Sequence, residues 1–104
     1  MSKADSLKTL VILLAKGLCH KIGSIVNSNA VYSQKYLKEA DNFFNLARDI
    51  SNEEHWNLSD REKIKEELIR AVRIELERRD FLDEKKFDYI LKEVEWILKE
   101  LGIG

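Results

Sequence analysis

Residues 83–104 read DEKKFDYILKEVEWILKELGIG, and they decide the fold because they describe one complete helix. Their apolar side chains recur at intervals of three and four residues, which places them along about one-third of a helix surface. A stripe of that width must be buried against other helices. The stripe consists of Phe87, Ile90, Val94, Ile97 and Leu101, with Leu91 and Leu98 beside them.

Both ends of this helix are also marked in the sequence. Asp83 can accept a hydrogen bond from the free N–H groups of the first turn, which predicts an N-cap. At the other end, Gly102 can take the left-handed conformation that terminates many helices. Ile103 can then fold back on Leu98, a contact that often accompanies such a cap.

The first helix is predicted to run from residue 5 or 6 to residue 26, and it is apolar on nearly every side. A helix of this kind is expected at the centre of a bundle. Ala15, Cys19 and Gly23 lie four residues apart, so they form a ridge of small side chains that a neighbouring helix can approach closely. Gly17 and Gly23 each cost up to about 1 kcal/mol inside a helix, and close packing is the expected compensation.

The middle of the chain predicts a second helix and a connector. Residues 27–29 are Asn-Ser-Asn, which favours a turn. The second helix is predicted over residues 30–50, and the short link makes it antiparallel to the first. Residues 51–58 follow as a connector, in which Trp56 and Leu58 are expected to plug the end of the bundle.

A third helix is predicted over residues 60–79. Ser59 and Glu62 have the spacing of a capping box that opens it. Glu75 falls on the inner arc of this helix among apolar residues, which indicates one of two roles. It is either a polar switch or partner contact, or an edge residue that reaches solvent at the margin of the bundle.

The predicted fold class is all-α, with a four-helix antiparallel (up-down-up-down) bundle as one domain over residues 1–104. No stretch shows the alternation of apolar and polar residues that strands require. The alternative is a three-helix core in which the first helix forms an arm exchanged between subunits.

The composition is that of an ordinary soluble protein, with 44% hydrophobic and 36% charged residues. The formal net charge of −1 gives no general attraction to nucleic acid or to anionic membranes. The longest apolar run, residues 10–15, is far shorter than the roughly 20 residues that span a bilayer. No cleavage pattern of a signal peptide follows it, and Cys19 is the only cysteine, so we expect a cytoplasmic protein. One Gln beside 12 Lys and 12 Glu is typical of thermophilic sources.

The sequence predicts no metal site and no cofactor. It contains two histidines, His20 and His55, and no Glu-x-x-His pair of the kind that a di-iron bundle needs. Cys19 and His20 are adjacent, so on a helix they point about 100° apart and do not converge on one ion. No phosphate-binding loop and no nucleophile with an obvious base is present, so neither an enzyme nor a small-molecule substrate is expected.

Arg48 and His55 are separated by six residues, and Asp49 follows the arginine. This spacing resembles the Arg…His signature of the HEPN ribonucleases, which are helical bundles that commonly dimerise to bring two such motifs together. The resemblance implies RNA cleavage without metal, in which His55 is the acid–base group and Arg48 stabilises the phosphate charge. A metal-independent ribonuclease or toxin is therefore the alternative function. Arg48 otherwise complements the dipole at the end of its helix.

Tyr89 and Trp96 are seven residues apart, on a face of the last helix that is predicted to lie opposite the buried stripe. Their neighbours on that face are charged, and large aromatic residues in such a setting are enriched at protein–protein contacts. We therefore predict a protein-interaction module, either a homodimer or a subunit of an assembly, with Tyr89, Trp96 and Trp56 at the contact. The alternative is that the first helix or the connector covers Trp96. Nucleic acid is an unlikely partner, because acidic residues cancel the basic ones of the third helix.

Overall fold

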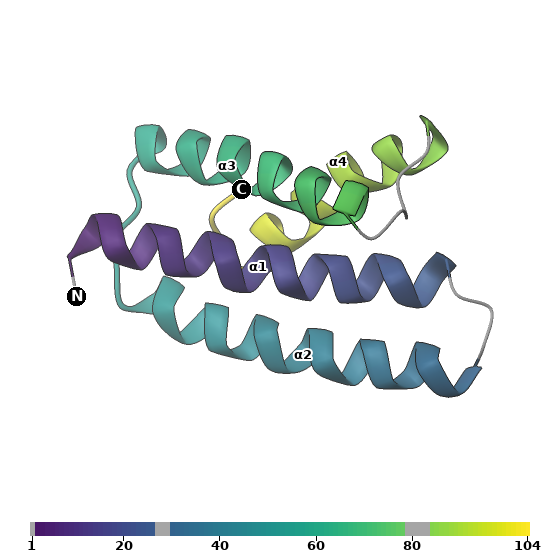
Figure 1. The fold of residues 1–104 in the computed structure, drawn as a ribbon. Coiled ribbons are helices and arrows are strands. Elements are labelled where there is room, and N and C mark those ends of the chain that lie inside the picture. The colour runs from purple at the N-terminus through teal and green to yellow at the C-terminus, as the bar shows by residue number, and fades with distance from the viewer. Residues whose placement is uncertain (1, 27–29, 79–83) are drawn as a thin grey trace.

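The computed structural model describes residues 2–26, 30–78 and 84–104. Successive helices run in opposite directions, so the chain forms the predicted up-down-up-down four-helix bundle (Figure 1). The described residues form no strand. The predicted turn at 27–29 and the N-cap at Asp83 lie outside these residues. The helices are α1 (Lys3–Val26), α2 (Ala30–Asn52), α3 (Leu58–Arg78) and α4 (Glu84–Glu100).

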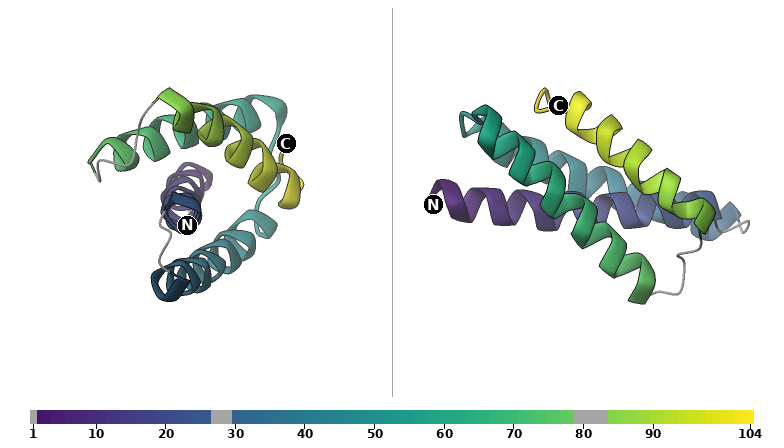
Figure 2. Two further views of the ribbon diagram at one scale, coloured as in Figure 1. Left: turned by 90° about the vertical axis from the view of Figure 1, so that its right-hand side faces the viewer. Right: turned by 90° about the horizontal axis from the view of Figure 1, so that it is seen from above.

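Helix α1 lies at the centre of the bundle, as its apolar surface predicts. Seen along its axis, α1 has α2 on one side and the α3–α4 pair on the other (Figure 2). It packs against all three of the other helices, most extensively against α2. Over the described ranges, the backbone of α2 does not closely approach α3 or α4. The bundle is therefore open between α2 and α3, and α1 belongs to the core of its own chain.

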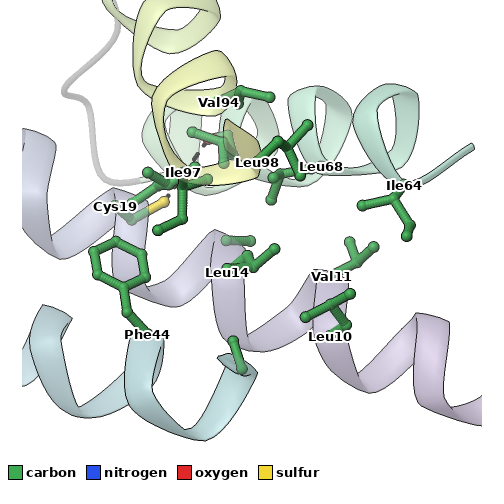
Figure 3. Packing of buried hydrophobic residues seen from close by; sticks show 14 of the residues in the cluster. Leu10, Val11, Leu14, Cys19, Phe44, Ile64, Leu68, Val94, Ile97 and Leu98 are labelled. Atoms are coloured by element: carbon green, nitrogen blue, oxygen red, sulfur yellow. Dashed lines mark hydrogen bonds between the residues drawn. The ribbon is translucent and has the colours of Figure 1, made fainter. Parts of the chain in front are cut away.

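The hydrophobic core runs along α1 and is closed by one face of each other helix (Figure 3). Full burial of one leucine or isoleucine side chain contributes roughly 1.5–3 kcal/mol. In the predicted stripe of α4, Ile90, Val94 and Ile97 are buried and Leu101 is partly buried. The most deeply buried side chains are Leu10, Leu14, Leu18 and Ile22 of α1, Ile64, Leu68, Val72 and Leu76 of α3, and Ile90, Val94 and Ile97 of α4.

Two small residues of α1 permit close helix packing. Cys19 is buried, and its Sγ lies 4.0 Å from the carbonyl oxygen of Val72 on α3. Gly17 faces α2 instead, and a Cβ placed there lies 2.5 Å from Cε1 of Phe44. The close approach that the sequence predicts is therefore confirmed at both positions, with α3 as the neighbour of Cys19 and α2 as the neighbour of Gly17.

The end of α4 has the predicted cap. Gly102 has a φ of 72°, in the left-handed region. The N–H of Ile103 donates to the carbonyl oxygen of Leu98 at 2.8 Å, and the N–H of Gly102 donates to that of Lys99 at 3.0 Å. Ile103 and Leu98 are both buried, so the cap also closes an apolar contact.

The start of α3 differs from the prediction. The capping box is formed by Asn57 and Asp60 rather than by Ser59 and Glu62. Oδ1 of Asn57 accepts the N–H of Asp60 at 2.8 Å, and Oδ2 of Asp60 accepts the N–H of Asn57 at 3.0 Å. Lys3 of α1 adds an ion pair to the same Oδ2 at 2.6 Å. This contact from a distant part of the chain favours the earlier start of the helix.

The capping box of Asn57 and Asp60 predicts two effects on the stability of the fold, one of a substitution and one of pH. Replacing Asn57 by Ala is expected to cost about 1 kcal/mol, because the first turn of α3 loses its cap. The hydrogen bond from Lys3 and that from the backbone of Asn57 hold the pKa of Asp60 below its usual value of 3.8. The contribution of the ionised carboxylate is therefore complete well above that value and disappears as the pH falls through the lowered pKa.

The measurement is chemical unfolding of the wild type and of Asp60→Asn between neutral and strongly acidic pH. We expect the wild type to be more stable near neutrality and the two curves to converge in acid. Asp49→Asn is the matched control, because Asp49 is exposed and makes no ion pair in the described part of the chain. A constant difference between wild type and Asp60→Asn at every pH contradicts the prediction.

Candidate interaction surfaces

Trp96 is held in place by two other helices and remains 38% exposed. The ammonium group of Lys21, from α1, lies 3.4 Å from the centroid of the indole ring. The edge of the indole meets the ring of Phe44 from α2, with centroids 5.7 Å apart and planes at 72°. One side of Trp96 is therefore covered by its own chain, and the rest faces solvent.

Lys21 connects this indole to a buried carboxylate. Its Nζ lies 2.6 Å from Oε2 of Glu93, and only 8% of Glu93 is exposed. Glu93 precedes Trp96 by three residues, so both project from neighbouring positions on α4. A cation shared between a carboxylate and a ring face is stabilised by both, since each presents negative charge to it. This arrangement fixes the orientation of the indole.

The aromatic face of α4 is rotated relative to the prediction. Glu93 is buried, so the buried arc of α4 extends up to the position beside Trp96. Trp96 therefore lies at the flank of the buried stripe instead of opposite to it. Leu91, predicted beside the stripe, is 38% exposed, and Tyr89 is 41% exposed. The direction of this face depends on α1 and α2, which provide Lys21 and Phe44.

Trp56 is buried at the end of the bundle. It is 6% exposed, and its Nε1–H donates to the carbonyl oxygen of Ser51 at 3.2 Å. The guanidinium Nε of Arg61 donates to the carbonyl oxygen of Trp56, also at 3.2 Å. Trp56 thus plugs the end of the bundle as expected, whereas Leu58 is 73% exposed and does not. A role of Trp56 at a contact with another chain stays a prediction.

Arg48 lines the same hollow as Trp96 and makes no described contact with His55. Arg48 is exposed on α2, and His55 is exposed after the end of that helix. Among the described residues, no hydrogen bond or ion pair links the two. The ribonuclease hypothesis stays a prediction that rests on their spacing. Arg48 instead borders a hollow of about 340 Å³, which is lined by Asp41, Phe44, Asn45, Arg48, Trp96, Ile97 and Glu100.

His20 takes part in packing between α1 and α2. Its Nδ1 donates to the carbonyl oxygen of Lys16 at 2.7 Å, and its Nε2 lies 2.8 Å from Oε2 of Glu39. The rings of Tyr36 and Phe43 lie against it, with centroids 5.8 and 5.4 Å away. Within the described ranges, no three His, Cys, Asp or Glu side chains are grouped so that they can hold a metal ion.

A hollow lies on the open side of the bundle, and the sequence did not indicate it. It has a volume of about 450 Å³, and a neighbouring hollow of about 330 Å³ shares Ile12, Ala71 and Ile74 with it. Ile12 is 54% exposed and Ile74 is 48% exposed. We call the two hollows together the α1–α3 groove. Its lining consists of Lys8, Val11, Ile12, Ala15, Lys16, His20, Phe43, Glu67, Arg70, Ala71, Ile74 and Glu75.

The groove exists because α2 does not reach α3. Helix α1 therefore presents a strip of its surface between them, with Ile12 at the middle. Phe43 of α2 borders one side and Ile74 of α3 the other. Glu75, whose side chain is 33% exposed, lies at this margin and pairs with Arg78 at 3.4 Å. Both roles predicted for Glu75, a partner contact and an edge residue, therefore refer to this one position at the margin of the groove.

No helix in the described part of the chain is both long enough and apolar enough to cross a bilayer. Comparison of the chain with known proteins finds no matching family model, no matching curated protein and no matching solved structure.

Proposed function

We propose that this protein is a helical interaction module, and that the α1–α3 groove binds a helix of a protein partner. The observation that carries the proposal is the exposure of Ile12 and Ile74, which both line the two hollows of the groove. Each square ångström of apolar surface removed from water contributes about 25 cal/mol. A helix with an apolar stripe is the usual ligand of such a groove. The location proposed for this protein is the cytoplasm.

The shape and charge of the groove favour a protein over other ligands. A small molecule is usually bound in a pocket that encloses most of its surface, whereas Ile12 at the floor of this groove is more than half exposed. A nucleic acid requires an uncompensated basic surface. The groove instead has Glu67 and Glu75 on α3 among its basic residues Lys8, Lys16 and Arg70.

The face formed by Tyr89 and Trp96 is a second proposed contact. Lys21 and Phe44 hold the indole in one orientation, so little side-chain freedom remains to be lost when a partner binds. The exposed part of Trp96 also borders the hollow next to Arg48. With two contact faces, one small bundle can form a homodimer that belongs to an assembly, or it can be a subunit between two partners.

Differential capture tests the proposal. The wild-type protein and two variants, Ile12→Asp/Ile74→Asp and Tyr89→Ala/Trp96→Ala, serve as baits in extracts of the source organism. We expect a protein that the wild type retains to be lost from the groove variant, because two carboxylates replace the apolar contact. Binding is then measured with the purified partner, and a loss of at least about 100-fold in affinity is expected.

Leu46→Asp is the matched control, because Leu46 is 53% exposed and lines neither hollow of the groove. This variant should retain the partner, and thermal unfolding should show that all baits are folded. Retention of every captured protein by the groove variant overturns the groove as the contact. A loss confined to Tyr89→Ala/Trp96→Ala assigns the contact to α4 instead.

A further inference from the structure

We infer that the partner in the α1–α3 groove is a second copy of this chain, related to the first by a twofold axis that runs along the groove. This inference rests on the proposed function and specifies the partner. It is carried by the charges on the two sides of the groove, which are opposite in sign and match in spacing.

The basic side of the groove belongs to α1 and the acidic side to α3. Lys8 and Lys16 are eight residues apart, and so are Glu67 and Glu75. Eight residues of helix span about 12 Å, so the two sides have the same spacing. Lys8 and Glu67 border one hollow of the groove, and Lys16 and Glu75 border the other. Each lysine therefore shares a hollow with one glutamate, although α3 crosses α1 obliquely (Figure 2).

The direction of the helices allows a twofold axis to use this match. Helices α1 and α3 run the same way along the bundle (Figure 1). Rotation by 180° about an axis between them, parallel to the groove, places α1 of one copy over α3 of the other without reversing it. Lys8 then faces Glu67 of the second copy, and Lys16 faces Glu75 of the second copy. The symmetry repeats both pairs, so one dimer contains four such pairs.

The apolar residues lie between these charges. Ile12 is midway between Lys8 and Lys16 in sequence, and Ile74 is on the facing side of the groove. In the dimer, Ala71 of each copy lies level with Ile12 of the other and Ile74 follows about one turn further along, so these apolar residues become buried together. An apolar centre surrounded by charged pairs is the usual anatomy of a specific interface.

Two neighbouring basic residues are compatible with this arrangement. Glu75 already has partners in its own chain, Arg78 at 3.4 Å among them, and a carboxylate can accept hydrogen bonds from more than one donor at once. Arg70 borders the groove but also borders a hollow on the outer side of α3, so it lies at the crest of that helix. With Arg70 included, the α3 side has a net charge of −1 against +2 on the α1 side.

The molecule is large enough for such a contact. A stable interface buries about 800 Å² on each partner, roughly one-eighth of the 6682 Å² surface of this chain. The molecule measures 39 × 26 × 21 Å, so one broad face provides this area. The groove lies on one such face, between α2 and α3.

Charge reversal tests the arrangement. Variant one is Lys8→Glu/Lys16→Glu, and variant two is Glu67→Lys/Glu75→Lys. Sedimentation over a dilution series up to about 1 mM should show that the wild type dimerises. Each variant alone should dimerise at least about 100-fold more weakly, because like charges then face each other. An equimolar mixture of the two should form a heterodimer, since all four pairs are again opposite in sign.

The controls make the same changes in charge on other surfaces. The two control variants are Lys35→Glu/Lys38→Glu and Glu53→Lys/Glu62→Lys. The four residues are exposed and lie outside the groove, so both variants should dimerise like the wild type at moderate salt. A chain with all four groove substitutions should dimerise with itself again. Circular dichroism should show that every variant is helical.

The outcomes separate this inference from the proposed function. A wild type that stays monomeric up to about 1 mM overturns the inference, while the captured partner still tests the groove. A dimer that survives both charge reversals also overturns it, and its loss in Tyr89→Ala/Trp96→Ala then assigns self-association to α4. A foreign protein that competes with the dimer, and is lost from the Ile12→Asp/Ile74→Asp bait, leaves the proposed function intact and replaces the second copy as the partner.

Discussion

Replacing Gly17 by Val is expected to destabilise the protein by about 3 kcal/mol, and replacing it by Ala by about 1 kcal/mol. A methyl group at this position lies 2.5 Å from Cε1 and 2.8 Å from Cδ1 of Phe44. The ring of Phe44 cannot easily move away, because its other side packs against Trp96. In an ordinary helix interior, Gly→Ala stabilises by up to about 1 kcal/mol, so the expected loss has the opposite sign.

Urea unfolding of the single and double variants measures this effect. Phe44→Leu removes the ring and is destabilising by itself, because it leaves space next to Gly17 and Trp96. In the background of Phe44→Leu, the change Gly17→Ala should become neutral or stabilising, since the new methyl group then fills part of that space. If Gly17→Ala alone is more stable than the wild type, α2 yields to the methyl group and the close approach is not a constraint.

Replacing Lys21 by Met is expected to cost about 2–3 kcal/mol, which makes it the most damaging change at an ion pair in this chain. The substitution leaves the carboxylate of Glu93, which is 8% exposed, without its cation. Removing one member of a fully buried pair costs about 3–5 kcal/mol, and the expected value is lower because 24% of the Lys21 side chain is exposed. The face of the Trp96 ring loses the same ammonium group.

A double-mutant cycle isolates the interaction. Replacing Glu93 by Leu in the Lys21→Met background should recover most of the lost stability, because no buried charge is then left unpaired. Lys65→Met is the matched control. Lys65 pairs with Glu95 at 3.6 Å with both side chains exposed, and such pairs contribute about 0–1 kcal/mol. Equal losses for Lys21→Met and Lys65→Met are the result that contradicts a special role for the buried pair.

The parts of the fold that follow local rules were predictable from the sequence. The cap at Gly102 and Ile103 needs one residue without a Cβ and one apolar residue after it, and both requirements are visible in six residues. The apolar surface of α1 indicated its central position, because a helix without a polar face has to be surrounded. The same periodicity indicated the four helices, although α1 and α3 begin earlier and α2 ends later than predicted.

The start of α3 shows where local rules are insufficient. Two possible capping pairs overlap between Asn57 and Glu62, and only Ser59 with Glu62 fits the usual sequence pattern of a capping box. The structure uses Asn57 and Asp60, and Lys3 of α1 pairs with the second of them. The choice between two adequate caps therefore depends on a residue more than 50 positions away, which no local pattern contains.

The candidate surfaces were the least predictable part, because they depend on how the helices are arranged. Ile12 is one of six consecutive apolar residues, and only the separation of α2 from α3 leaves it in contact with solvent. Trp96 differs from its expected exposure in the opposite direction. It was expected on a free face, and Lys21 and Phe44 from two other helices cover part of it.

The central position of α1 has a consequence for folding during synthesis of the chain. Helix α1 emerges from the ribosome before the three helices that shield it. When α2 has followed, the two form a hairpin from contacts that are local in sequence. The side of α1 that later packs against α3 remains exposed to solvent until the second half of the chain is synthesised. During synthesis the nascent chain thus exposes an apolar surface of α1 that chaperones can recognise.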